Sequence, residues 1–199
     1  MSIQTRRERE RAERERLIVT AARDLAEAEG WDAVTTRRLA AEIEYSQPVL
    51  YSHFKGKDAI MAAVAVEGCA ELAAELREAR AGSADPAGGL ANVAGAYAGF
   101  AERRPALYDA MFTHAVDLPF ATPEAPAPLQ EAFGELRETV RPFAGEDDPE
   151  VLTETFWSAL HGLVTLMRDG RMRREQHERR LAVLIRRFSN WPAAGQHSS

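Results

Sequence analysis

The polar side chains with the clearest chemical purpose lie in one short segment, residues 47–53. Its exposed side would carry an amide, a phenol and an imidazole, from Gln47, Tyr51 and His53, and its apolar side would carry Val49, Leu50 and Phe54. Ser46 precedes the segment as a possible helix cap, and Pro48 is tolerated in a first turn because no helix hydrogen bond is lost there. A short helix with these polar tips can enter the major groove of DNA.

A second short helix must position this segment. Leu39, Ala40 and Ile43 recur at the spacing of one buried helix face, and either Thr35 or Thr36 can cap the free amides at its start. A three-residue connection, residues 44–46, joins the two helices. This helix-turn-helix pattern predicts that the partner is double-stranded DNA.

Catalytic chemistry has little support in the sequence. Gly-rich phosphate loops and His/Cys sets at metal-ligand spacing are both missing. The histidines are scattered along the chain, and Cys69 lies in an Ala-rich helical segment where it reads as a small packing residue. We expect no enzyme activity, no metal and no cofactor.

The distribution of charge and apolar residues bounds the class of protein. The longest apolar run, residues 59–66, is too short to cross a bilayer, and the charged N-terminus lacks the apolar core of a secretory signal. Residues 1–57 hold 11 Lys/Arg against 10 Asp/Glu, a balance of +1, so the excess of negative charge lies entirely in residues 58–199, at −7. The single cysteine predicts a cytoplasmic protein. Because residues 1–57 are nearly neutral, we expect DNA binding through specific side-chain contacts and not through a large positive potential.

Helical periodicity continues through the whole chain. An all-α fold is predicted, with helices over residues 17–29, 57–80, 86–103, 105–115, 127–143, 149–169 and 174–190. Gly30 is placed to end the first of these in a left-handed cap. The charged segment 6–16 is either an exposed helical extension or a frayed arm, and its Arg6, Arg7 or Arg9 could instead reach a neighbouring phosphate or the minor groove.

The domain organisation follows from the breaks between these helices. Four prolines predict a long loop over residues 116–128, and residues 192–199 look like a disordered tail. We expect a three-helix DNA-binding domain over residues 1–60, a helical effector-binding and dimerisation domain over residues 61–190, and a tail over residues 191–199.

Three stretches resemble the DNA-binding domain of the TetR family of bacterial transcriptional regulators: Thr35–Ala40, Gln47–His53, and the aromatic and lysine of Phe54-x-x-Lys57. The resemblance implies that Arg37 reads guanine, that Gln47 reads adenine and that Pro48 packs on a thymine methyl group. It implies phosphate contacts by Thr36, Tyr51 and Lys57, and groove-facing positions for Val49 and His53. The family usually has Gly in the turn, where this chain has Glu44.

Trp157-x-x-x-His161-Gly162 resembles a signature of one group of TetR C-terminal domains. The apolar faces of residues 149–169 and 174–190, together with the TetR resemblance, imply a homodimer in which these helices form half of a four-helix bundle. A concentration of aromatic and apolar side chains predicts a small, mostly apolar effector. The candidate residues that would line its pocket are Tyr97, Phe100, Met111, Phe112, Trp157 and His161. The alternative for each of them is ordinary core packing.

The sequence therefore predicts a ligand-responsive repressor that binds a palindromic operator. Three alternatives remain open: an activator with the same fold, a helical ligand-binding protein without DNA binding, and a helical enzyme. Arg37, Gln47 and Tyr51 speak against the second alternative, and the lack of convergent carboxylates or histidines speaks against the third.

Overall fold

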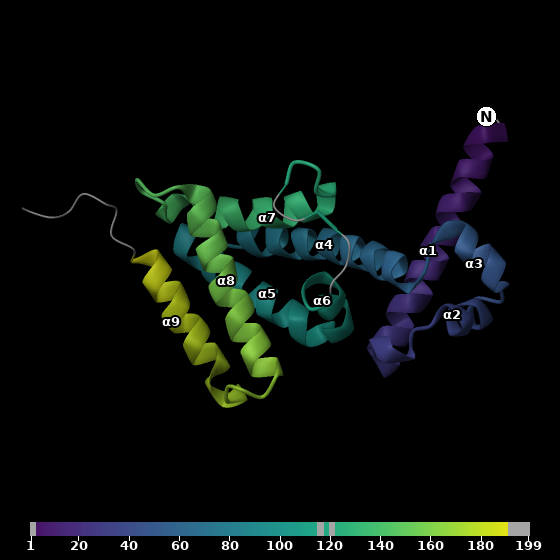
Figure 1. The fold of residues 1–199 in the computed structure, drawn as a ribbon. Coiled ribbons are helices and arrows are strands. Elements are labelled where there is room, and N and C mark those ends of the chain that lie inside the picture. The colour runs from purple at the N-terminus through teal and green to yellow at the C-terminus, as the bar shows by residue number, and fades with distance from the viewer. Residues whose placement is uncertain (1–2, 115–117, 120–121, 191–199) are drawn as a thin grey trace, which may run out of the picture. The chain divides into compact units, whose positions relative to one another are not determined.

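The structure is a computed structural model that describes residues 3–114, 118–119 and 122–190. Every regular element among these residues is a helix, which confirms the predicted all-α class (Figure 1). The chain divides into two compact units. The first unit contains the residues up to Cys69 together with Arg104–Pro126, and the second contains Ala70–Arg103 together with the residues from Ala127 onward.

The first unit is built from α1 (Ile3–Glu29), α2 (Thr36–Glu42), α3 (Gln47–His53), the first part of α4 (Lys57–Ala81) and α6 (Pro105–Phe112). Each of these helices buries apolar side chains completely, among them Ile18, Ala22, Leu39, Leu50, Ile60 and Leu107. The predicted boundary at residue 60 between a DNA-binding and an effector domain lies within α4, and it stays a prediction.

The charged N-terminal segment is helical and forms the first half of α1. Arg6 pairs with Glu10 at 2.8 Å and Arg11 pairs with Glu15 at 2.8 Å, both at the i,i+4 spacing that supports an exposed helix. Such exposed pairs each contribute only a few tenths of a kcal/mol. Of the two conformations left open by the sequence, the structure therefore has the helical extension.

Gly30 ends α1, but not in the predicted left-handed cap. Its φ of 83° is combined with a ψ of 163°, an extended conformation at positive φ that only glycine adopts readily. The chain then enters a short 3-10 turn, Trp31–Ala33. The prediction failed because a glycine after a helix indicates a positive φ without fixing ψ.

Helix α6 packs within the first unit although it is distant in sequence. The Glu27 carboxylate accepts hydrogen bonds from the amides of Ala106 at 3.2 Å and Leu107 at 3.0 Å, and Trp31 Nε1 donates to the Ala106 carbonyl at 2.8 Å. A carboxylate suits this place because the first amides of a helix lack intrahelical partners. A Cβ atom at Gly68 would lie 2.8 Å from Leu107 Cδ1, so any larger residue there would displace the Leu107 side chain where α4 and α6 approach each other.

The turn between α2 and α3 is closed by backbone hydrogen bonds. The Tyr45 amide donates to the Ala40 carbonyl at 2.8 Å and the Glu44 amide donates to the Ala41 carbonyl at 3.3 Å, the pattern of a Schellman cap. Glu44 has a φ of 57° and occupies the left-handed position of this cap. The TetR family usually has Gly at this position, and the structure shows that Glu44 adopts the left-handed conformation that glycine adopts readily.

Glu44→Gly should raise the free energy of unfolding by up to about 1 kcal/mol. A left-handed conformation costs a non-glycine residue about 1–2 kcal/mol, and the larger conformational entropy of glycine in the unfolded chain offsets part of that gain. Urea denaturation measures the difference. Glu42→Gly, inside the right-handed helix, is the matched control and should destabilise; an equal loss from both variants would contradict the strain at Glu44.

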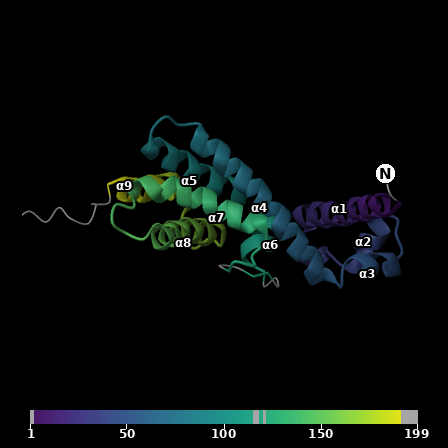
Figure 2. The ribbon, with the colours of Figure 1, turned by 90° about the horizontal axis from the view of Figure 1, so that it is seen from above.

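The second unit contains the rest of α4, α5 (Pro86–Arg103), α7 (Ala127–Val140), α8 (Pro149–Arg168) and α9 (His177–Ser189) (Figure 2). These helices match the predicted ones apart from their ends, where residues 141–143 and 174–176 form 3-10 turns. Asp148 caps the start of α8, because its carboxylate accepts from the amides of Glu150 at 2.7 Å and Val151 at 3.4 Å.

The interior of the second unit joins α8 to α9 and α4 to α7. The rings of Phe156 on α8 and Phe188 on α9 meet edge to face with centroids 5.0 Å apart. The buried Glu135 carboxylate accepts from Arg77 Nε at 2.7 Å and from Arg80 Nη2 at 2.8 Å, which satisfies its charge with two guanidinium groups.

Two predicted irregular regions are only partly described. In the predicted loop over residues 116–128, residues 118–119 and 122–126 are non-helical, residues 115–117 and 120–121 lie outside the described residues, and α7 already begins at Ala127. The predicted tail over residues 191–199 lies wholly outside the described residues.

Candidate nucleic-acid interface

Helix α3 presents the predicted base-reading side chains on its outer side. Leu50 is completely buried and anchors the helix, whereas Val49 is 38% exposed and Tyr51 is 52% exposed. Gln47 and Pro48, in the first turn, are exposed as well. The N-terminal half of α3 is thus accessible, as it must be for the helix to enter the major groove of DNA.

Two neighbouring arginines on α2 have different surroundings. Arg38 holds both carboxylate oxygens of Glu29, with Nη1 at 2.8 Å from Oε2, and the guanidinium lowers the pKa of that carboxyl from its ordinary value. Arg37 is exposed, and no hydrogen bond or ion pair to another described residue engages its guanidinium. Arg38 therefore fastens α2 to α1, and Arg37 keeps all five donors available for a ligand.

Thr36 and Tyr51, two predicted phosphate contacts, lie together. The Tyr51 hydroxyl is 3.3 Å from Thr36 Oγ1, and either group can be the donor. Two hydroxyls from different helices meet at this point, one at the start of α2 and one on α3. A phosphate oxygen that accepted from both would fix the position of the two helices on a duplex.

Lys57 is placed at the start of α4 but is already engaged. Its ammonium donates to the Trp31 carbonyl oxygen and the side chain is half-buried. A lysine has three donors, so two remain for a phosphate, and the unpaired amides at the start of a helix favour the same charge.

His53 does not point outward with the rest of α3. Its side chain is only 6% exposed, and Nδ1 lies 3.3 Å from Glu15 Oε1 on α1. The sequence contained a sign of this, because His53 follows the buried Leu50 by three residues and so shares its helix face. The geometry gives His53 a role in packing α3 against α1 and offers no support for the predicted groove-facing position.

The six candidate ligand-binding residues are divided between the units. Met111 and Phe112 belong to α6 in the first unit, where Met111 is buried and the Phe112 ring meets Tyr108 with centroids 4.9 Å apart. Tyr97, Phe100, Trp157 and His161 belong to the second unit. Sequence spacing could not reveal this division, because it depends on where α6 packs.

Three of the second-unit residues form a hydrogen-bonded group. Trp157 Nε1 donates to the Tyr97 hydroxyl at 3.0 Å, and that hydroxyl lies 3.4 Å from His161 Nδ1. His161 Nε2 lies 3.4 Å from the hydroxyl of Thr165, a member of the group that the sequence did not indicate. Burial, and secondarily the charge of Arg168, lowers the pKa of His161, so its imidazole is neutral at pH 7.

Metal binding and thiol chemistry have little support in the part of the chain that the structure describes. His, Cys, Asp and Glu side chains nowhere gather there in threes that could hold a metal ion. Burial raises the pKa of the Cys69 thiol to about 12, which leaves it unreactive. Among the described helices, none has both the length and the apolar character to cross a membrane.

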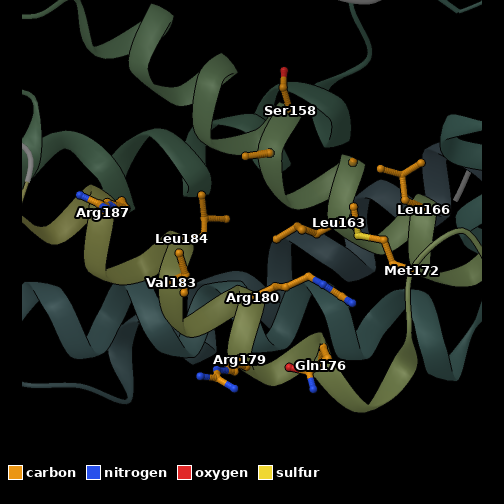
Figure 3. A pocket seen from close by; sticks show the side chains of 12 residues that line it. Ser158, Leu163, Leu166, Met172, Gln176, Arg179, Arg180, Val183, Leu184 and Arg187 are labelled. Atoms are coloured by element: carbon orange, nitrogen blue, oxygen red, sulfur yellow. The ribbon is translucent and has the colours of Figure 1, made fainter.

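A groove of about 720 Å³ runs between α8 and α9 (Figure 3). Its lining combines apolar and small side chains with three guanidinium groups. These residues are Ser158, Ala159, Gly162, Leu163, Leu166, Met172, Gln176, Arg179, Arg180, Val183, Leu184 and Arg187. None of them was among the candidate site residues of the sequence.

Two family models match the chain. Residues 18–64 match the one described as bacterial regulatory proteins, tetR family, and residues 90–188 match the one described as tetracyclin repressor-like, C-terminal domain. An uncharacterised HTH-type transcriptional regulator of Mycobacterium tuberculosis is 32% identical over 157 residues, which cover 78% of this chain and 70% of that protein. The class D tetracycline repressor of Escherichia coli is 44% identical over 50 residues, 25% of this chain and 23% of that protein.

Solved structures share the fold. A protein of unknown function from Rhodococcus sp. RHA1 has a TM-score of 0.75 and 22% identity, with 90% of this chain and 95% of that chain covered. The TetR family regulator PfmR from Thermus thermophilus has a TM-score of 0.61 and 23% identity, with 85% and 97% covered. At these identities the likeness shows the fold alone.

Proposed function

Because the chain belongs to the TetR family of DNA-binding transcriptional regulators, we propose that it is a ligand-responsive repressor that binds a palindromic operator as a homodimer. Members of this family regulate transcription and are not enzymes. The site of action would be the bacterial cytoplasm, where the DNA lies. DNA binding would belong to residues 1–60, and effector binding and dimerisation to residues 61–190.

The observation that carries the DNA-binding proposal is the contrast between Arg37 and Arg38. One of two adjacent guanidinium groups on α2 is bound by a carboxylate and the other is left exposed. A free guanidinium fork matches the two acceptors of guanine in the major groove. In this proposal Gln47 reads adenine, and Pro48, Val49 and the Tyr51 ring pack on base edges.

Register on the duplex would come from Thr36, Tyr51 and Lys57. Their donors to phosphate carry no sequence information but fix the depth and angle of α3. His53 would not contact DNA; its contact with Glu15 would position α3 against α1.

The proposed homodimer is supported by the outer face of α8 and α9. Val151, Leu166 and Val183 are 59%, 37% and 43% exposed, and two of them line the groove between the helices. Exposed apolar side chains gathered on one face are typical of an interface. A second copy would present two reading helices related by a two-fold axis, which is why the operator should be palindromic.

The proposed effector site is the group formed by Tyr97, Trp157 and His161. It combines a buried phenol, an indole and a neutral imidazole, which is the mixture of apolar walls and few polar tips that small-molecule sites use. Phe100 from α5 is buried in the same unit. The one or two polar groups of a mostly apolar effector would compete for the hydrogen bonds that these side chains make to one another.

His161→Phe should leave operator affinity within about twofold and reduce release of DNA by an effector found in a screen of apolar acids and alcohols. The imidazole is exchanged for a ring of similar size, so the packing persists while the polar tip is lost. Fluorescence anisotropy of a labelled operator measures both properties. If the variant instead loses several kcal/mol of stability and keeps its effector response, His161 is a packing residue.

A reporter gene distinguishes repression from activation. With an operator selected from random duplexes placed across a promoter, expression of the protein should lower reporter output, and the effector should restore it. A rise in output that depends on the protein would instead show an activator. Output that ignores the selected operator would contradict regulation through it.

A further inference from the structure

The outer face of α8 carries a regular stripe of side chains that point away from its own unit. Val151, Thr155, Ser158, Gly162 and Leu166 follow one another at spacings of four, three, four and four residues, close to the repeat of a helix–helix seam. The opposite face of α8 is buried in the unit through Leu152, Phe156, Leu160, Val164 and Met167. The stripe is therefore presented to a partner.

We propose that the stripe pairs with the same stripe of a second copy in an antiparallel arrangement, with the two-fold axis between Ser158 and Ala159. The proposal rests on the homodimer proposed above and specifies its register. In a two-fold pair the residues that face each other have a constant sum of positions. This axis places Val151 opposite Leu166 of the second copy and Thr155 opposite Gly162 of the second copy.

The exposed apolar residues select this register over its neighbour. Val151 and Leu166, which are 59% and 37% exposed, cover each other here. A shift of the axis to residue 160 would place Val151 opposite the carboxylate of Asp169, which is exposed at the end of α8. Apolar surface would then stay in water, or a charge would lose its hydration, and both are unfavourable.

Small side chains at the centre allow the two helices to approach closely. A Cβ atom at Gly162 would find no atom within 4 Å in its own chain, so the space above it is open. Thr155 uses its hydroxyl on the Val151 carbonyl at 2.8 Å, which leaves its methyl group for the interface. Contact from Val151 to Leu166 spans about 22 Å of helix, so the crossing must be shallow, as in four-helix bundles.

Charge along α8 fits the antiparallel direction. Glu154 lies near the N-terminal end, while Arg179 and Arg180 of α9 line the groove beside the C-terminal end of α8. Arg180 extends across the groove in Figure 3, and its Nη1 is buried without a hydrogen-bond partner among the described residues. An antiparallel second copy brings its Glu154 to this end of the groove, where the carboxylate would pair with the part of the Arg180 guanidinium that lines the groove, since the buried Nη1 is already covered within the protomer.

Disulfide trapping tests the register. Val151→Cys combined with Leu166→Cys should give a covalent dimer under mild oxidation, and Val151→Cys combined with Asp169→Cys should give at least tenfold less. Residues 151 and 166 are about 22 Å apart along one helix, too far for a disulfide within one chain. Native Cys69 is buried and does not compete.

Charge exchange tests the proposed pair of Glu154 and Arg180. Glu154→Arg should weaken dimerisation at least tenfold in sedimentation, and the double variant Glu154→Arg/Arg180→Glu should recover to within about threefold of the native dimer. Glu178→Arg, the same change at an exposed position of α9 outside the groove, should leave dimerisation unchanged. Circular dichroism melting confirms that each variant is folded.

The possible results separate the register from the dimer itself. A native protein that sediments as a monomer overturns the homodimer and the register together. A native dimer that is trapped through positions 151 and 169, or through neither pair, overturns the register and leaves the homodimer standing. A double charge variant no tighter than the single variant overturns the pairing of Glu154 with Arg180.

Discussion

Arg37→Ala should weaken binding to the selected operator by about 1–3 kcal/mol, roughly 5- to 150-fold, and relax the base preference at one position of each half-site. Arg37 is an exposed residue of α2 and its guanidinium is not held by a described side chain, so its loss should not disturb the fold. Titrations against the operator and against its single-base variants measure both effects.

Arg38→Ala is the matched control for this prediction. It removes the same charge from the adjacent position, but the guanidinium it removes is bonded to Glu29. We expect a small loss of stability and an unchanged base preference. Equal weakening of all duplexes by Arg37→Ala would show that Arg37 contacts phosphate and does not read a base.

Val183→Glu should dissociate the dimer and lower operator affinity at least 100-fold. Val183 is 43% exposed in the protomer, so a charge is tolerated there, but the groove that it lines would be covered in the dimer. Arg179 and Arg187 lie one turn away on either side, but this carboxylate and its guanidinium partners would lose their hydration when the groove is covered, which costs several kcal/mol. A monomer also loses the second half-site, whose binding is favoured by a high effective concentration once the first is bound. Sedimentation and anisotropy measure these two consequences.

Phe188→Glu provides the contrast on the same helix. The Phe188 ring packs against Phe156 inside the protomer, so this change should lower the unfolding temperature as well as the affinity. Val183→Glu should keep the protomer folded and lower the unfolding temperature only by the concentration-dependent stabilisation that dimerisation provides. A Val183→Glu protein that remains dimeric would place the interface elsewhere.

The sequence was most informative where local spacing decides the structure. Apolar periodicity located α5 and α8 to within a residue or two, because one face of each helix is buried in its own unit. The motif over residues 35–57 located α2, the turn and α3. Glu44 was noted as a departure from the Gly usual in the turn, and the structure shows its left-handed backbone.

The sequence was least informative where long-range packing decides. Nothing in residues 105–112 shows that Glu27 and Trp31 hold the start of α6 in the first unit, about 75 residues away along the chain. The candidate pocket residues were therefore grouped across a division that only the fold reveals. His53 was assigned outward from its polar chemistry, although its spacing from Leu50 places it on the buried face.

Footprinting on an operator selected from random duplexes tests the central claim most directly. The account predicts two identical protected half-sites related by a two-fold axis, with centres separated by a whole number of helical turns of about 10 base pairs. Arg37→Ala should weaken both halves equally. Protection of a single asymmetric site, or binding that does not distinguish the selected duplex from random DNA, would contradict a dimer that reads sequence through α2 and α3.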